Sequence, residues 1–203
     1  MNYIIDNEYF PDYTLFKRLG HNSNCIIEQY VPYRKLSFSN RCTLPGANGL
    51  INLSVPLQKG RDQKTLLKEV RIANLDPWQA RHWKTITACY NRSPWFDYFR
   101  DGLETLYKKK MDFLVDWNQE CFIWASENLS LNLQISFTES FQATYPSDTH
   151  TDLRTRSNTV GRNQQMSPGD QYTQVFEERL GFISGLSVID RIFCDGVKGW
   201  LKS

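Results

Sequence analysis

Residues 2–30 have the sequence NYIIDNEYFPDYTLFKRLGHNSNCIIEQY, and this stretch decides the expected fold. Residues 2–5 are predicted to form a short strand, and residues 12–19 a short helix that ends at Gly20. Residues 24–30 are predicted to form a second strand. A strand, a helix and a strand within about 30 residues outline a βαβ unit. We therefore expect the two strands to be parallel.

The segments that follow predict a hairpin and then a helical region. Residues 38–44 and 50–57 flank a loop, 45–49, whose residues tolerate positive φ. Hydrophobic spacing predicts three helices, which cover residues 76–91, 93–110 and 112–128. Asp76 and Ser93 are the expected N-caps of the first two. Further strands are expected at 69–72 and 133–141, and a last helix at 187–195.

These elements predict an α/β fold. Its mixed sheet starts with the βαβ unit and the hairpin, three helices lie in the centre, and a helix ends the chain; an α+β fold is the alternative. The whole chain, 1–203, is expected to be one domain. Within it, only six of the thirty residues 143–172 are apolar. A loop of this length is either disordered or a functional lid.

The composition excludes several classes of protein. No apolar run approaches the roughly 18 residues that a transmembrane helix needs. The first six residues include Asp6 and lack the basic and apolar regions of a signal peptide, so a cytoplasmic protein is expected. The five cysteines form no C-x-x-C pair, which argues against a zinc finger. We expect reduced thiols that lie mostly in the core, and a nucleophilic cysteine stays an open alternative.

The net charge of +2 hides a difference between the two halves of the chain. Residues 1–110 carry 17 Lys+Arg and 10 Asp+Glu, a net of +7, whereas residues 111–203 carry 7 and 12, a net of −5. The excess in the first half favours a small phosphorylated or other anionic ligand. The alternative is that the halves neutralise each other in the fold. The total charge makes no case for a nucleic-acid partner.

No common cofactor or hydrolase motif is present: the sequence contains no GxGxxG, P-loop, HExxH or GxSxG string. We therefore expect no cofactor and no metal. Among the three histidines, His82 lies one turn from Trp78 and one turn from Ile86 on the same face of its predicted helix. It is either a core histidine or, in the functional hypothesis, a general base.

Basic and amide residues cluster in the first third of the chain. They are Arg34, Lys35, Asn40 and Arg41. Guanidinium groups bind phosphate or carboxylate through two hydrogen bonds, and Asn adds a neutral donor and acceptor. Arg41 has apolar or hydroxyl-bearing neighbours in a predicted strand, which favours a binding role over that of a solvated charge.

Asp152 and Arg154 form a second charged pair, within the polar segment 143–172. One interpretation is a local salt bridge. The other is that a closing lid brings the pair into a site, where Asp152 is expected to be catalytic and Arg154 to bind the substrate.

Several short motifs follow one another along nearly the whole chain. They are Glu8-Tyr9-Phe10-Pro11, Gln29-Tyr30, Asn40-Arg41-Cys42, Gly46-Ala47-Asn48-Gly49, Trp78 with His82-Trp83, Asp152-Leu153-Arg154, Gln174-Val175-Phe176 and Leu186-Ser187-Val188-Ile189-Asp190. In this order they resemble the WbqC-like protein family. The sequence departs from that family at Asp6-Asn7, where many relatives have Gln-Pro, and at Cys194, where Asn is usual.

The resemblance implies a role in surface polysaccharide biosynthesis, because the family takes its name from a protein encoded among O-antigen biosynthesis genes. The hypothesis is a cytoplasmic transferase that acts on a nucleotide-activated sugar or a similar phosphorylated precursor. Tyr30 and Gln174 lie in the family-like motifs and join the residues expected to bind this substrate.

Two other classes of function stay open. A non-catalytic binding or assembly protein of the same pathway predicts a large exposed apolar patch and a buried His82 with both ring nitrogens hydrogen-bonded. A nucleic-acid-binding protein needs a continuous basic stripe with aromatic residues between the charges. The transferase is favoured if four side chains converge on one cleft: Arg41, His82, Asp152 and Arg154.

Overall fold

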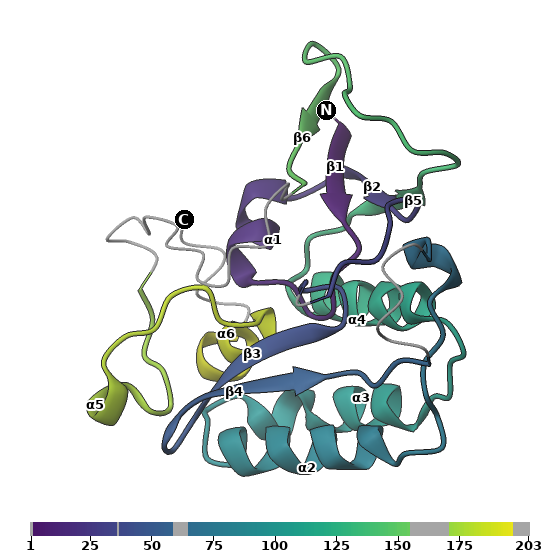
Figure 1. Ribbon diagram of the computed structural model, residues 1–203. Helices are drawn as coiled ribbons and strands as arrows, with labels where there is room; N and C mark the ends of the chain where they lie inside the picture. Colours follow the sequence, from purple (N-terminus) through teal and green to yellow (C-terminus); the bar gives the residue numbers. More distant parts are fainter. Residues whose placement is uncertain (1, 36, 59–64, 155–170, 197–203) are drawn as a thin grey trace.

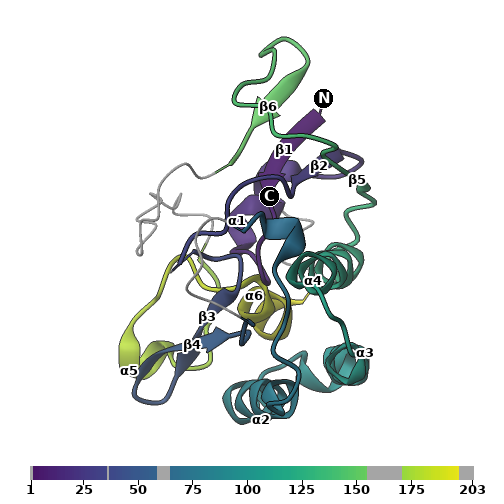
Figure 2. The same cartoon turned by 45° about the vertical axis from the view of Figure 1, so that its right-hand side comes forward.

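The computed structural model describes residues 2–35, 37–58, 65–154 and 171–196. These residues form the predicted α/β fold (Figure 1). The parallel strands and the antiparallel hairpin, expected in one mixed sheet, lie in two separate sheets. Both views show the larger sheet at one end of the molecule and a hairpin with two helices at the other (Figure 2). The two ends are joined by a shared core of aromatic and aliphatic side chains.

The larger sheet has four strands in the order β5-β2-β1-β6, and all of its pairs are parallel. Its strands are β1 (Asn2–Asp6), β2 (Asn24–Glu28), β5 (Gln134–Phe137) and β6 (His150–Asp152). The predicted βαβ unit is confirmed, since α1 (Tyr13–Leu19) connects β1 to β2. Asp12 caps α1 by accepting hydrogen bonds from the Thr14 and Leu15 N–H groups.

The hairpin consists of β3 (Arg41–Gly46) and β4 (Gly49–Ser54), which pair antiparallel. The sequence predicts a five-residue loop, 45–49, but Pro45 and Gly46 belong to β3 and Gly49 to β4, so only Ala47 and Asn48 separate the two strands. Pairing of Gly46 with Gly49 allows this tighter turn, because Gly49 has a φ of 123°, a conformation that favours glycine.

The three central helices are confirmed as α2 (Trp78–Tyr90), α3 (Phe96–Lys108) and α4 (Leu114–Asn128). Neither of the first two is capped by the predicted side chain. Asp76 pairs with Arg81 instead, and Ser93 Oγ donates to the Tyr90 carbonyl at 2.8 Å. Both side chains thus have partners other than the first-turn N–H groups that a cap would satisfy.

The C-terminal helix is α6 (Val188–Asp195), and its predicted start is confirmed. The Ile189 N–H donates to Ser187 Oγ at 3.4 Å, and Gly196 ends the helix with a φ of 62°. A short helix, α5 (Glu177–Leu180), precedes it.

Two predictions of local structure differ from the fold. Residues 69–72 do not form a continuous strand: η1 (Leu67–Glu69) is a 3-10 turn, and Arg71 and Ile72 each make an isolated bridge to a different segment. Segment 143–172 was expected to be a loop throughout, but it contains the edge strand β6. Part of its polar composition therefore belongs to an edge strand. The rest of the predicted lid, 155–170, lies outside the described residues.

The helices α4 and α6 lie between the large sheet and the hairpin end in both views (Figure 1, Figure 2). The Phe16 ring of α1 stacks on Phe122 of α4 with centroids 5.0 Å apart. Tyr90 of α2 contacts Phe193 of α6 at 5.2 Å. These contacts make one core, on which the loops at the carboxyl ends of the parallel strands are supported.

Candidate functional site

A cavity of about 250 Å³ lies where three distant segments of the chain meet. Its walls come from the loop after β1 (residues 8–12), from the hairpin, and from residues 183–187 before α6. The polar side chains among the described lining residues are Glu8, Asp12, Arg41, Thr43, Asn52, Ser184 and Ser187. Because the cavity joins a guanidinium, carboxylates, hydroxyls and an amide, it can recognise a small polar ligand.

Ser187 connects the walls of this cavity. Its N–H donates to the Thr43 carbonyl of β3 at 2.9 Å, and its Oγ donates to the Phe10 carbonyl at 3.1 Å. The next residue, Val188, donates its N–H to the Pro11 carbonyl at 2.8 Å. Phe10 has a φ of 43°, a left-handed conformation that a non-glycine residue keeps only where its surroundings hold it. The loop after β1 is therefore fixed on the start of α6.

Arg41 is the sequence-predicted binding residue found in the cavity wall. It begins β3, is partly exposed, and donates from Nε to the Ser37 carbonyl at 3.3 Å. Its neighbour Asn40 plays a different part, because it accepts from Tyr33 Oη at 3.1 Å and donates to the Val55 carbonyl at 3.0 Å. Asn40 thus holds the base of the hairpin that presents Arg41.

Arg34 and Lys35 lie exposed before the hairpin, and neither is among the described lining residues. Gln174 is buried, and both polar atoms of its amide hydrogen-bond the backbone of Ile183. Gln174 therefore reaches the cavity indirectly, through a residue of its wall.

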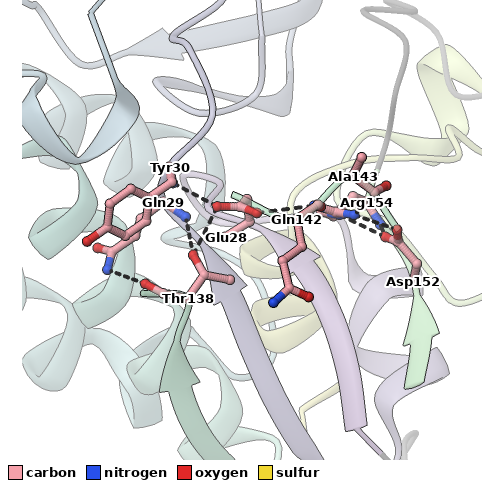
Figure 3. A network of polar contacts seen from close by, with 8 residues as sticks. All are labelled: Glu28, Gln29, Tyr30, Thr138, Gln142, Ala143, Asp152 and Arg154. Atoms are coloured by element: carbon pink, nitrogen blue, oxygen red, sulfur yellow. Dashed lines mark hydrogen bonds and ion pairs between the residues drawn. The ribbon is translucent and has the colours of Figure 1, made fainter. Parts of the chain in front are cut away.

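A second polar arrangement lies at the carboxyl edge of the parallel sheet. Figure 3 shows Arg154, which follows β6, between Glu28 at the end of β2 and Asp152 at the end of β6. Arg154 Nη1 donates to Glu28 Oε2 at 3.1 Å, and Nε and Nη2 donate to the two Asp152 oxygens at 2.9 and 2.7 Å. The Glu28 side chain is fully buried and that of Arg154 is 6% exposed. The local salt bridge that was one interpretation of Asp152 and Arg154 is thus present. Glu28 extends it into the interior of the protein.

The Arg154 guanidinium uses all of its donors within the protein. Besides Glu28 and Asp152, it donates to the carbonyls of Gln142 at 2.9 Å and Ala143 at 3.4 Å (Figure 3). These five contacts match the five N–H groups of a guanidinium. The hydrogen bonds to Asp152 are the main cause that raises the pKa of Arg154. The prediction that Arg154 binds substrate therefore requires this network to open.

The other Glu28 oxygen ties the ends of β2 and β5 together. Glu28 Oε1 accepts from the Tyr30 N–H at 2.7 Å and from Thr138 Oγ1 at 2.9 Å. Gln29 adds a hydrogen bond to the Thr138 carbonyl at 3.0 Å (Figure 3). The predicted binding residue Tyr30 thus contributes its backbone to this network, while Lys68 lies 4.1 Å over its ring.

Residues 7–168 match the model of the WbqC-like protein family. The chain belongs to the WbqC-like protein family. The matched range includes the loop after β1, the hairpin with Arg41, and the Glu28–Arg154–Asp152 network. No curated protein and no solved structure matches the chain. The family resemblance that the motifs predicted is confirmed.

In this WbqC-like chain, His82 lies in an aromatic cluster under the hairpin. Its Nδ1 is 3.0 Å from Tyr9 Oη, and it also hydrogen-bonds the Ser54 backbone. The rings of Trp78 and Tyr107 contact it, and it is 6% exposed. Burial lowers the pKa of His82 to about 4, against the opposing effect of the Ser54 hydrogen bond. The imidazole is therefore neutral near pH 7 and has a partner on each side.

The four side chains that were to converge lie in three places. Arg41 lines the cavity, Asp152 and Arg154 meet in the sheet-edge network, and His82 belongs to the aromatic cluster. Sequence reasoning did not single out Glu28, although it ends a predicted strand, and carboxyl ends of parallel strands share one edge. It also passed over Thr43 and Asn52 of the cavity wall, which sit in an ordinary hairpin pattern.

A buried carboxyl group, that of Asp190, lies in α6. Asp190 accepts hydrogen bonds from Tyr90 Oη at 2.8 Å and Tyr172 Oη at 2.5 Å. Burial raises the pKa of Asp190 to about 6, although these hydrogen bonds oppose the shift. The cluster joins α2 and α6 to the segment that leads into the cavity wall.

A membrane-spanning helix and a metal-binding cluster are both absent from the part of the chain that the structure describes. Among these residues no helix is both long and apolar enough to cross a membrane. Nor do three or more His, Cys, Asp or Glu side chains of the described ranges come together in an arrangement that would hold a metal ion.

Proposed function

We propose that the protein is a transferase of surface polysaccharide biosynthesis that acts on a nucleotide-activated sugar or a similar phosphorylated precursor. Membership of the WbqC-like family supports the pathway. The observation that carries the proposal is the cavity in which Arg41 lies beside the hydroxyl and amide groups of Thr43 and Asn52. A guanidinium binds phosphate through paired hydrogen bonds, and hydroxyl and amide groups suit the hydroxyls of a sugar.

The size of the cavity suits one part of such a ligand. Its volume of about 250 Å³ is slightly below the roughly 300–1,000 Å³ of most small-molecule pockets. The sugar and its adjacent phosphate would occupy it, and the nucleoside would lie outside. The loop after β1 forms one wall, which agrees with the general position of ligands beyond the carboxyl ends of strands in open α/β sheets.

In this proposal the phosphate binds Arg41 and lies away from the carboxylates of Glu8 and Asp12, which line the same cavity. The charged residues outside the cavity take no direct part. Asp152 and Arg154 support the sheet edge through Glu28. The catalytic roles predicted for His82 and Asp152 stay predictions: a neutral imidazole held by Tyr9 would first have to leave the aromatic cluster.

A non-catalytic binding or assembly protein is the second candidate. The burial of His82 with a hydrogen bond on each side favours it. The second feature that it requires lacks support: the exposed large hydrophobic residues of the described ranges lie on separate segments, at Leu50, Leu75, Tyr98 and Phe141. The two candidates differ in turnover, because a binding protein would hold a nucleotide sugar without cleaving it.

Isothermal titration calorimetry with UDP-glucose, glucose 1-phosphate and glucose tests the proposal. We expect the two phosphorylated compounds to bind and glucose to bind far more weakly. Arg41→Ala should weaken the phosphorylated ligands about 10- to 150-fold, since a hydrogen bond to a charged group contributes roughly 1.5–3 kcal/mol. Arg100→Ala, on the exposed surface of α3, is the matched control and should change nothing.

Two outcomes would contradict the proposal. One is that neither phosphorylated compound binds. The other is that Arg41→Ala binds both as tightly as the unaltered protein does. Binding without release of UDP, tested over a panel of sugar and amine acceptors, would favour the binding protein over the transferase.

A further inference from the structure

Residues 172–187 form a strap that ends in the cavity wall. At its start, Tyr172 Oη donates to Asp190 at 2.5 Å, and the Tyr172 ring meets Phe182 edge-on at 5.7 Å. At its end, Ser187 is fixed to β3 and to the loop after β1. Between these ends, Ile183, Ser184, Gly185 and Leu186 line the cavity.

Gln174 closes this strap into a loop. Its Nε2 donates to the Ile183 carbonyl at 2.8 Å, and the Ile183 N–H donates to its Oε1 at 2.9 Å. The side chain is nearly inaccessible, with 4% of Gln174 exposed. A carboxamide places an N–H donor and a carbonyl acceptor side by side, so it pairs with a backbone residue as a neighbouring strand would. The side chain also hydrogen-bonds Tyr172 at the start of the strap. Both polar atoms of the amide are thereby occupied by the protein.

The backbone next to Ile183 turns at two glycines, which explains why a clamp is needed there. Gly181 has a φ of 71° and Gly185 a φ of 72°, and glycine visits this region at little cost. A short segment between two such residues has many accessible conformations when it is not held. The Gln174 amide selects one of them, in which Ile183 faces the cavity.

We propose that Gln174 is a positioning residue: it acts through Ile183 to hold residues 183–186 as a preformed wall of the cavity, and so sets the affinity for the phosphorylated sugar. The part that concerns affinity rests on the proposed function; the clamp itself does not. In this role Gln174 does not contact the substrate. It holds the backbone that forms part of the surface which the substrate contacts.

Gln174→Glu distinguishes this role from a general effect on folding. An ionised carboxylate can still accept from the Ile183 N–H, but it cannot donate to the Ile183 carbonyl and repels it. A protonated carboxyl regains the donor, and burial favours the protonated form. Asp190, which holds Tyr172 at the start of the strap, also titrates between pH 8 and pH 5, so each comparison is made with the unaltered protein at the same pH. We expect UDP-glucose to bind about tenfold more weakly to Gln174→Glu than to the unaltered protein at pH 8, as the loss of about one hydrogen bond would cause, and equally well at pH 5. Gln174→Ala should be weakened at both pH values.

Amide hydrogen exchange gives a readout that needs no ligand. The Ile183 N–H should exchange at least tenfold faster in Gln174→Ala, because its acceptor is gone. Gln58→Ala is the matched control: Gln58 Nε2 also donates to a backbone carbonyl, that of Ile72 at 3.1 Å, but Gln58 is not among the described lining residues. It should change neither Ile183 exchange nor UDP-glucose binding.

Unchanged Ile183 exchange in Gln174→Ala would overturn the clamp. Faster exchange with unaltered UDP-glucose affinity would overturn its effect on the site, as would a loss in Gln174→Glu that pH 5 does not reverse. If the unaltered protein binds no phosphorylated sugar, the proposed function fails, and Ile183 exchange still decides the clamp.

Discussion

Two of the buried polar clusters differ in charge. At the sheet edge, the Arg154 guanidinium is enclosed between two carboxylates, those of Glu28 and Asp152, and pairs with both. At the helical end, His82 is enclosed with the hydroxyls of Tyr9 and Tyr107, and every group is neutral. Charged groups enter a protein interior only when paired and fully hydrogen-bonded, whereas a histidine enters by giving up its charge.

This difference separates structural charges from charges that a ligand can reach. Arg154 meets five acceptors from the protein and lies almost entirely buried. Arg41 is partly exposed on the wall of a cavity. Two arginines that look alike in sequence therefore have unlike environments, and the second is the better candidate for a phosphate.

Removal of Arg154 should give the largest effect on stability. In Arg154→Ala, the buried Glu28 carboxylate loses its charge partner, and breaking a buried pair in this way costs about 3–5 kcal/mol. Urea unfolding followed by tryptophan fluorescence measures the change. Arg100→Ala, which removes an exposed partner of Asp97 and Asp101, is expected to leave the midpoint in place. Equal small effects in both variants would erase the distinction between buried and surface pairs.

Acid should affect the neutral cluster through His82. Its pKa of about 4 in the fold lies below the usual 6.5, so the unfolded chain takes up a proton at higher pH than the folded one. The contribution of His82 to the free energy of unfolding is complete above pH 6.5. It falls by about 3 kcal/mol as the pH drops to 4. The contribution of Asp190 has the opposite sign, because its pKa in the fold is raised to about 6. The free energy of unfolding gains about 3 kcal/mol as the pH falls from 6 to 3.8, the usual pKa of an aspartate.

Single variants uncover these two opposed contributions. Between pH 6.5 and 4, Asp190→Asn should lose about 3 kcal/mol more than the unaltered protein, because the His82 effect is then unopposed. His82→Gln should show the reverse slope. Urea unfolding at several pH values measures the free energy of unfolding of each variant and of the unaltered protein. The difference between them cancels the effect of the other carboxylates, which titrate alike in all three proteins. Parallel pH curves for the three proteins would refute both shifts.

Tyr107→Phe should have the smallest effect. It removes the hydroxyl next to Tyr9 and keeps the ring that packs on Trp117, while Tyr9 retains its hydrogen bond with His82. One neutral hydrogen bond contributes about 1 kcal/mol. Thermal unfolding should show a correspondingly small drop in Tm. A loss of stability as large as that of Arg154→Ala would mean that removing a partner from the neutral cluster costs as much as removing one from the charged cluster.

Much of the fold is predictable because its signals are local. Asp12 and Gly20 delimit α1, Ser187 and Gly196 delimit α6, and the glycines of the hairpin permit its tight turn. Edge strand β6 was missed because three polar residues without alternation carry no strand signal; it exists through its pairing with β1. Asp76 was predicted as a cap, and its pairing with Arg81 shows that a nearby cation can outcompete backbone N–H groups.

The sequence alone determined the βαβ start, the helical middle, the family and the presence of Arg41, Asp152, Arg154 and Gln174 in motifs. Only the tertiary structure decided what these residues meet. Glu28 and Arg154 are 126 positions apart, and they touch because parallel strands bring their carboxyl ends to one edge. The cavity likewise needs the loop after β1, the hairpin and the start of α6 together. Propensities and caps act over a few residues, whereas a site depends on contacts between distant segments that only the completed core fixes.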